Sequence, residues 1–72
     1  MRLPKVTILK YEPNVMERGG AVNRYRLSVE NLANMVIVTT PYRPDQTDEE
    51  QRLREVDLAI EVDKFVREQA DI

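Results

Sequence analysis

The groups of this 72-residue chain that could do chemistry are its carboxylates, hydroxyls, arginines, lysines and tyrosines, because the sequence contains no Cys and no His. Their absence removes disulfides, thiolate and imidazole metal ligands, Cys nucleophiles and the commonest general base. Any activity therefore has to come from acidic groups, hydroxyl groups or basic groups.

Carboxylates gather in two places, at 48–50 and at Asp57 with Glu61, and both places lie in a segment with a helical sequence. Such charges usually cover a solvated helix surface, and a carboxylate site also needs a cleft that so short a chain has little depth to build. Gly19-Gly20 lacks the third glycine and the Lys-Ser/Thr of a phosphate loop. The hydroxyl residues have no base to activate them. The sequence predicts a protein that is not an enzyme and holds neither a cofactor nor a metal.

A cluster of basic and aromatic residues indicates binding more strongly than the carboxylates and hydroxyls indicate catalysis. Arg24 and Arg26 flank Tyr25, and Lys5 and Lys10 lie in a neighbouring segment. Basic side chains beside aromatic rings on a sheet can bind single-stranded nucleic acid by phosphate pairing and base stacking. Strand alternation, however, turns Tyr25 to the face opposite the two arginines. The net charge of −2 also disfavours phosphate binding. Nucleic-acid binding through the Arg24/Arg26 face is therefore the second hypothesis.

Two strands are predicted in the first part of the chain. Residues 5–11 are rich in β-branched and aromatic side chains, and Pro13 is expected to end this strand at 12–14. Gly19-Gly20 predicts a hairpin turn, with a mobile loop over 12–20 as the alternative. Residues 21–29 alternate as an amphipathic strand does. The first strand is expected to be an exposed edge of the sheet, open to strand addition.

A third strand and a long helix are predicted after these. Residues 35–40 are almost continuously apolar, which is typical of a central strand buried on both faces. Thr47 and Glu50 have the spacing of a capping box, and no Gly or Pro interrupts the segment up to Ala70. A helix of this length is longer than the strands. Its last turns, with Phe65 and Val66, should project past the sheet and meet a second copy, a partner or the Gly-Gly loop.

These elements predict an α+β fold, a three-stranded antiparallel sheet packed by one long C-terminal helix in the order βββα. The alternative order is ββαβα, in which Ser28 caps a short helix over 29–36. The chain is expected to be a single domain (1–72), with a β-rich basic part at 1–46 and an acidic capped helix at 47–70. The residues expected in the core are Val6, Ile8, Tyr25, Leu27, Val36, Val38, Leu53, Val56 and Ile60.

Charge is distributed unevenly along the chain. Residues 1–46 carry seven Lys or Arg against four acids, and residues 47–72 carry four against nine. Each part therefore presents one sign of charge to a visiting molecule. No apolar run reaches the length of a membrane span, no signal peptide is evident, and the lack of Cys fits a reducing compartment. We expect a cytoplasmic protein that contacts no membrane.

The first residues, Leu3-Pro-Lys-Val-Thr-Ile-Leu-Lys-Tyr11, and the charged segment after Thr47 resemble the layout of small phage host-takeover proteins. In particular the chain resembles a transcription regulator of a Xanthomonas-infecting lytic phage that binds RNA polymerase. The resemblance implies contact with the large polymerase subunits of the host, inhibition of transcription initiation, and an effect on termination. It includes no motif from which residue roles could be transferred.

The leading hypothesis is therefore a non-enzymatic, phage-encoded protein-binding regulator whose partner is a host protein, with RNA polymerase first among the targets. A structural homodimer closed by the end of the helix is a third hypothesis. The residues expected to contact a partner are Lys5, Lys10, Arg24, Arg26 and Phe65.

Overall fold

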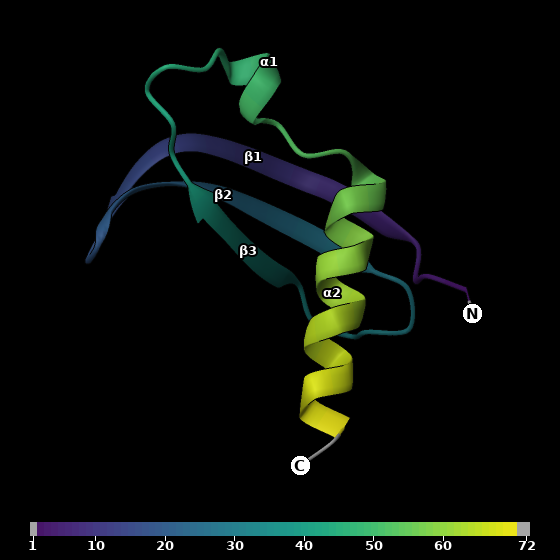
Figure 1. The fold of residues 1–72 in the computed structure, drawn as a ribbon. Coiled ribbons are helices and arrows are strands. Elements are labelled where there is room, and N and C mark those ends of the chain that lie inside the picture. The colour runs from purple at the N-terminus through teal and green to yellow at the C-terminus, as the bar shows by residue number, and fades with distance from the viewer. Residues whose placement is uncertain (1, 71–72) are drawn as a thin grey trace.

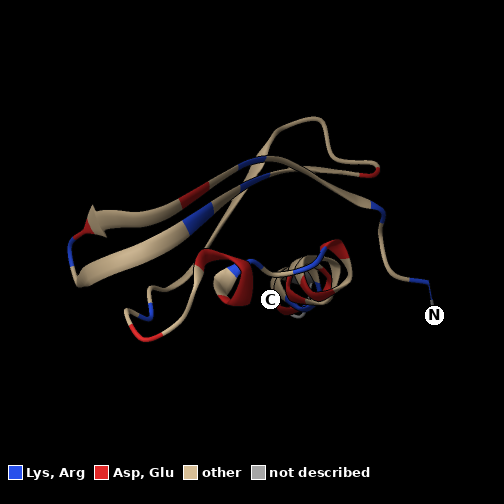
Figure 2. Ribbon diagram, turned by 90° about the horizontal axis from the view of Figure 1, so that it is seen from above, with Lys and Arg blue, Asp and Glu red and all other residues tan. Residues whose placement is uncertain are grey.

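In a computed structural model, which describes residues 2–70, three antiparallel strands form one sheet and two helices follow (Figure 1). The elements are β1 (Val6–Glu17), β2 (Gly20–Val29), β3 (Val36–Pro41), α1 (Asp48–Gln51) and α2 (Glu55–Ala70). Both helices lie on one side of the sheet (Figure 2). The α+β class and the order βββα are confirmed. The alternative ββαβα is wrong, because Ser28 ends up in β2 and residues 30–35 form an irregular loop.

A tight hairpin joins β1 to β2, as the two glycines predict. Glu17 pairs with Gly20, so Arg18 and Gly19 form the loop. Gly20 has a φ of 123°, a backbone conformation that side chains with a Cβ rarely adopt. The hairpin therefore depends on the glycine at this position.

The first strand does not end at Pro13, and this expectation was wrong. Strand β1 continues to Glu17 because the β1–β2 register shifts twice, between Ile8 and Lys10 and between Glu12 and Val15. Pro13 lies within the second shift, where no ladder hydrogen bond is required of it. Asn14 has a φ of 54°, and its N–H donates to Asn23 Oδ1 at 3.2 Å. A side chain of β2 thus holds the bulge in place.

The central strand is β2, not the apolar segment at 35–40, which corrects a second expectation. The sheet order is β1-β2-β3, so β3 is an edge strand that pairs with β2 alone. Its residues alternate between partly buried and exposed, and the Ile37 side chain is 54% exposed. One face of β3 is therefore exposed, although its sequence is almost continuously apolar.

The helix expected over 47–70 is interrupted, although its start is as predicted. Thr47 Oγ1 accepts the Glu50 N–H at 3.2 Å, and Glu50 Oε1 accepts the Thr47 N–H at 3.2 Å, which is a capping box. After Gln51 the chain becomes extended at Arg52. The backbone groups freed by this break are bound by the Tyr25 hydroxyl, which donates to Gln51 O at 2.6 Å and accepts from Leu53 N at 3.3 Å. A hydroxyl from β2 thus takes the place of helical hydrogen bonds.

The Gln51 side chain secures the same break from inside the protein. It is buried, and its Oε1 accepts from Asn23 Nδ2 at 3.0 Å and from Arg43 N at 2.9 Å. Its Nε2 donates to Gln46 O at 3.2 Å. Because buried amides are costly without partners, these bonds fix α1 against β2 and the loop before it.

The break decides which face of α2 reaches the core. Leu58, Ala59 and Val62 are buried against the sheet, whereas Val56 is 62% exposed and Ile60 is 47% exposed. The expectation that Val56 and Ile60 belong to the core was wrong, because α2 does not continue the axis and phase of α1. The other expected core residues are buried (Val6, Tyr25, Leu27) or packed against the buried cluster (Ile8, Val36, Val38, Leu53).

Helix α2 crosses the strands and its last turns lie beyond the edge formed by β3 (Figure 1). Phe65 and Val66, in this overhang, are 59% and 47% exposed. The β1–β2 hairpin lies at the far end of the sheet from the overhang, so the Gly-Gly loop does not cover it. The projecting, apolar helix end is as the sequence predicts.

Substituting Tyr25→Phe should lower the free energy of unfolding by about 1–3 kcal/mol, because Gln51 O and Leu53 N–H lose a buried partner. Urea denaturation followed by circular dichroism measures this change. Tyr42→Phe is the matched control, since the Tyr42 hydroxyl makes no hydrogen bond among residues 2–70. Equal losses for the two substitutions would contradict a role for the Tyr25 hydroxyl in the helix break.

Candidate functional site

The arginines expected to form a basic binding face are paired with acids of β1. Arg24 lies 3.0 Å from Glu17 and Arg26 lies 3.3 Å from Glu12. Tyr25 between them is fully buried on the helix side, as alternation predicts. These pairs offset much of the positive charge on the open face of the sheet.

A first strand that ends at Tyr11, as the sequence predicts, leaves both acids outside the strand, so the sequence does not indicate this pairing. Glu12 lies opposite Arg24 just before the second register shift, and the continuation of β1 through that shift brings Glu17 beside the hairpin turn. The signal that could have revealed it is the alternation of acids on one strand with bases on its neighbour, which cross-strand pairing favours.

The predicted partner-binding residues do not lie together. Lys10 is exposed in β1 opposite Arg26, and Lys5 is exposed just before β1. Phe65 is on α2, which packs on the other face of the sheet. The structure thus offers a partly neutralised basic face and, separately, an apolar surface around Phe65.

The apolar surface is a groove between β3 and the overhang of α2. The sequence predicts that Phe65 and Val66 project, but it does not predict the groove that they form with β3. We call it the β3–α2 groove. It has a volume of about 450 Å³. Glu61 is the one charged residue that lines it among residues 2–70. The other lining residues are Leu32, Val36, Ile37, Val38, Val62, Phe65 and Val66.

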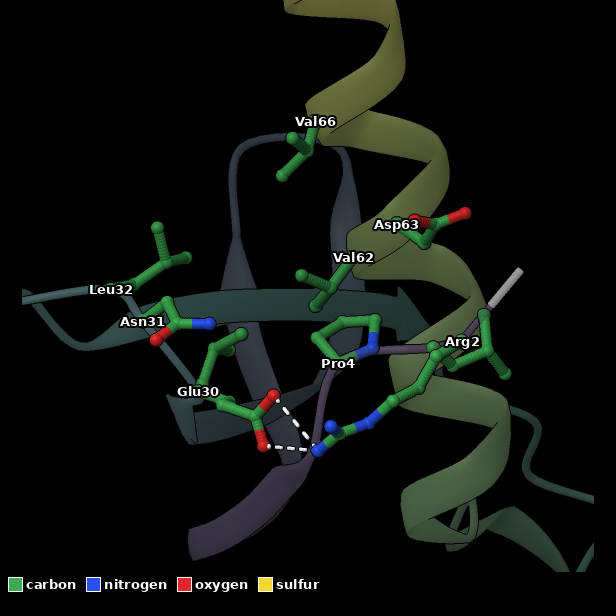
Figure 3. Close-up of a pocket in the computed structure, with 10 residues that line it drawn as sticks. Arg2, Pro4, Glu30, Asn31, Leu32, Val62, Asp63 and Val66 are labelled. Atoms are coloured by element: carbon green, nitrogen blue, oxygen red, sulfur yellow. Dashed lines mark hydrogen bonds and ion pairs between the residues drawn. The ribbon is translucent and has the colours of Figure 1, made fainter.

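A second hollow adjoins the β3–α2 groove on the side of the N-terminal segment (Figure 3). The two share Leu32, Val62 and Val66. At its other end Arg2 donates two hydrogen bonds to the Glu30 carboxylate, at 2.8 and 3.1 Å. The hollow has a volume of about 330 Å³. An exposed apolar surface, bordered by an ion pair, therefore runs along one flank of α2.

Within residues 2–70, no three His, Cys, Asp or Glu side chains come close enough together to hold a metal ion. None of the helices in this range is both long and apolar enough to cross a membrane. The groove can bury apolar surface of another molecule, and the edge strand β3 can pair its backbone with another strand.

Comparisons with protein-family models, with curated proteins and with solved structures find no match to this chain.

Among residues 2–70, Tyr11 is the titratable group whose pKa is shifted by its environment. Its ring stacks on that of Tyr25, with centroids 5.1 Å apart. Its hydroxyl is buried and has no hydrogen-bond partner in the described range 2–70. Burial, with a smaller effect of Tyr25, raises the pKa of Tyr11 above the ordinary value of 10.0. Tyr11 packs against the buried cluster and acts as a core residue.

Substituting Tyr11→Phe should leave the free energy of unfolding near neutral pH within about 1 kcal/mol of the parent, because the lost hydroxyl has no partner to leave behind. A raised pKa means that the folded state favours the neutral phenol. The stability that the folded state gains from keeping Tyr11 neutral is fully present below pH 10. It is lost as the pH rises through the folded-state pKa.

Urea denaturation at a series of pH values above and below 10 checks this expectation. The parent should lose stability more steeply than Tyr11→Phe as the pH rises above 10, and the difference isolates Tyr11 from other groups that titrate there. Parallel curves would show that Tyr11 ionises as readily in the folded chain as in the unfolded one.

Proposed function

We propose that this chain is a non-enzymatic protein-binding regulator that holds its partner at the β3–α2 groove. The observation that carries the proposal is the overhang of α2, which keeps Phe65 and Val66 exposed beside the apolar edge of β3. Exposed apolar surface of this kind is costly in water, and it marks sites where proteins associate. Because a short chain with a small core is marginally stable, burying this apolar surface against another molecule would stabilise it.

The leading partner in this proposal is bacterial RNA polymerase, through its large subunits, and the setting is the cytoplasm of a host infected by a phage. This part of the proposal depends on the resemblance in length and layout described above. On this basis the protein binds polymerase and inhibits or modulates transcription, without chemistry of its own.

The nucleic-acid alternative has less support. Its arginines face Glu17 and Glu12 at 3.0 and 3.3 Å, so a phosphate would have to displace an acid from each. Neutralised cations release few counterions and therefore contribute little to phosphate binding. A homodimer closed by the α2 overhang remains the structural alternative, and the oligomeric state distinguishes it from binding to a different protein.

Immobilised protein should retain a stoichiometric protein partner from a nuclease-treated bacterial lysate, and the retention should persist as salt is raised. Apolar contacts resist salt, whereas phosphate contacts do not. Mass spectrometry identifies the retained chains, and the large polymerase subunits are expected among them. Retention that disappears with nuclease would instead support nucleic-acid binding through Arg24 and Arg26.

Substituting Phe65→Ser should weaken that retention by about tenfold or more, because burying a Phe side chain contributes roughly 1.5–3 kcal/mol. The matched control is Val56→Ser, on the same helix and also exposed but outside the groove. Titrating the purified partner by isothermal calorimetry gives both affinities. Equal losses for the two substitutions would exclude the groove as the binding surface.

A further inference from the structure

The two edges of the sheet differ in how they are protected. Edge strands that must stay unpaired usually carry bulges, Pro or Lys. Strand β1 has all three: two register shifts, Pro13 and Lys10. Strand β3 has none over most of its length, because its register with β2 is continuous, it carries no charge, and its one Pro is the last residue. The sheet is thus blocked at one edge and open at the other.

The backbone groups at the open edge can be identified. Tyr42 N–H donates to Ala21 O at 3.1 Å, and the β2–β3 register continues from this pair. In an antiparallel ladder, alternate residues direct both backbone groups to the same neighbour. Val36, Val38 and Thr40 therefore bond to β2, whereas Ile37 and Thr39 direct their N–H and C=O groups away from the sheet.

The overhang of α2 lies above the place that a fourth strand would occupy. From buried Val62 to Gln69 the helix rises roughly 10 Å at 1.5 Å per residue. Adjacent strands are about 4.8 Å apart, so this length spans roughly two strand widths. Val36 and Val38, on the helix side of β3, already form one wall of the groove, and Phe65 forms another. A strand added to β3 would find its apolar side chains covered by α2.

The charge of the groove restricts which strand fits. Glu61 lines it, and none of the ion pairs formed within residues 2–70 includes Glu61. A second copy joined through β3 by a two-fold axis would bring two Glu61 carboxylates to one interface, and β3 has no basic residue to pair with either. A strand of another protein that carries Lys or Arg would satisfy Glu61 instead.

We propose that β3 binds an extended segment of a partner protein as a fourth strand, with apolar side chains at alternate positions entering the β3–α2 groove and a Lys or Arg facing Glu61. This inference rests on the proposed function and names its mode of recognition. Ile37 and Thr39 supply about four backbone hydrogen bonds, and the groove supplies the selection of side chains.

The probe is a peptide selected on the intact protein from a random twelve-residue library displayed on phage. The enriched sequences should alternate branched or aromatic residues with polar ones and should include Lys or Arg. Affinity is measured by fluorescence anisotropy with the enriched peptide in labelled synthetic form. In amide hydrogen exchange, the N–H groups of Ile37 and Thr39 should exchange rapidly in the free protein and slowly in the complex.

Two substitutions with matched controls test the two contacts. Ile37→Pro removes an N–H that β2 does not use, and it should weaken the peptide about tenfold, whereas Ile37→Val, which keeps the N–H, should have little effect. Glu61→Lys should weaken the peptide by a similar factor, whereas Glu68→Lys, outside the groove, should not. Thr39→Pro, with Thr39→Val as its control, replaces Ile37→Pro if amide spectra show that Ile37→Pro is unfolded.

Three outcomes of the peptide and sedimentation experiments would overturn the inference, and one outcome of the lysate experiment would do so as well. One is a library that yields no peptide sensitive to Ile37→Pro or Thr39→Pro, and another is enriched peptides without alternation. The third is a dimer in sedimentation that a folded edge variant dissociates, which would make a second copy the occupant. Partner retention from lysate that survives the edge substitutions would overturn strand addition but leave the proposed function standing, whereas a lysate without any partner would remove the proposed function itself.

Discussion

The hydrogen bonds between the Tyr25 hydroxyl and the backbone around the helix break are the constraint on which the rest of this structure depends. In a continuous helix, Gln51 O would accept from the N–H four residues later. Here it accepts from Tyr25 at 2.6 Å, and the chain turns before α2 begins. The direction of α2 across the strands follows from that turn. The overhang, the exposed Phe65 and the groove beside β3 therefore depend on a break that a tyrosine hydroxyl from the central strand helps to stabilise.

Features that depend on neighbouring residues could be predicted from the sequence, and features that depend on distant ones could not. The capping box at Thr47 and the Gly-Gly hairpin are local, and both are present. Residues 52–54 are Arg-Leu-Arg, which are good helix formers, so nothing local marks the break. The cause is a side chain 26 positions earlier in the chain. Because the break also resets the phase of α2, the same long-range contact explains why Val56 and Ile60 are exposed.

The predicted binding face differs from the observed candidate site for a similar physical reason. Apolar alternation and charge could identify the face of Arg24 and Arg26. The acids that neutralise it lie on either side of the bulge that contains Pro13, Glu12 before it and Glu17 after it. An almost continuously apolar run such as 35–40 is compatible with a strand that is covered on both faces. It is equally compatible with an edge strand that binds a further strand. Composition alone does not distinguish the two. Only the sheet order shows which one β3 is.

The protected and open edges together argue that the apolar surface is functional rather than incidental. A chain this short buries a smaller fraction of its surface than a larger domain does, so each exposed apolar group has a cost in stability and solubility. Strand β1 carries two bulges that prevent edge pairing. If edge pairing were merely a hazard, β3 would be expected to carry similar protection, yet it retains an even register and no charge. The helix extends past this same edge. A further strand would therefore pair with the open edge of β3 and cover the apolar end of the helix at the same time.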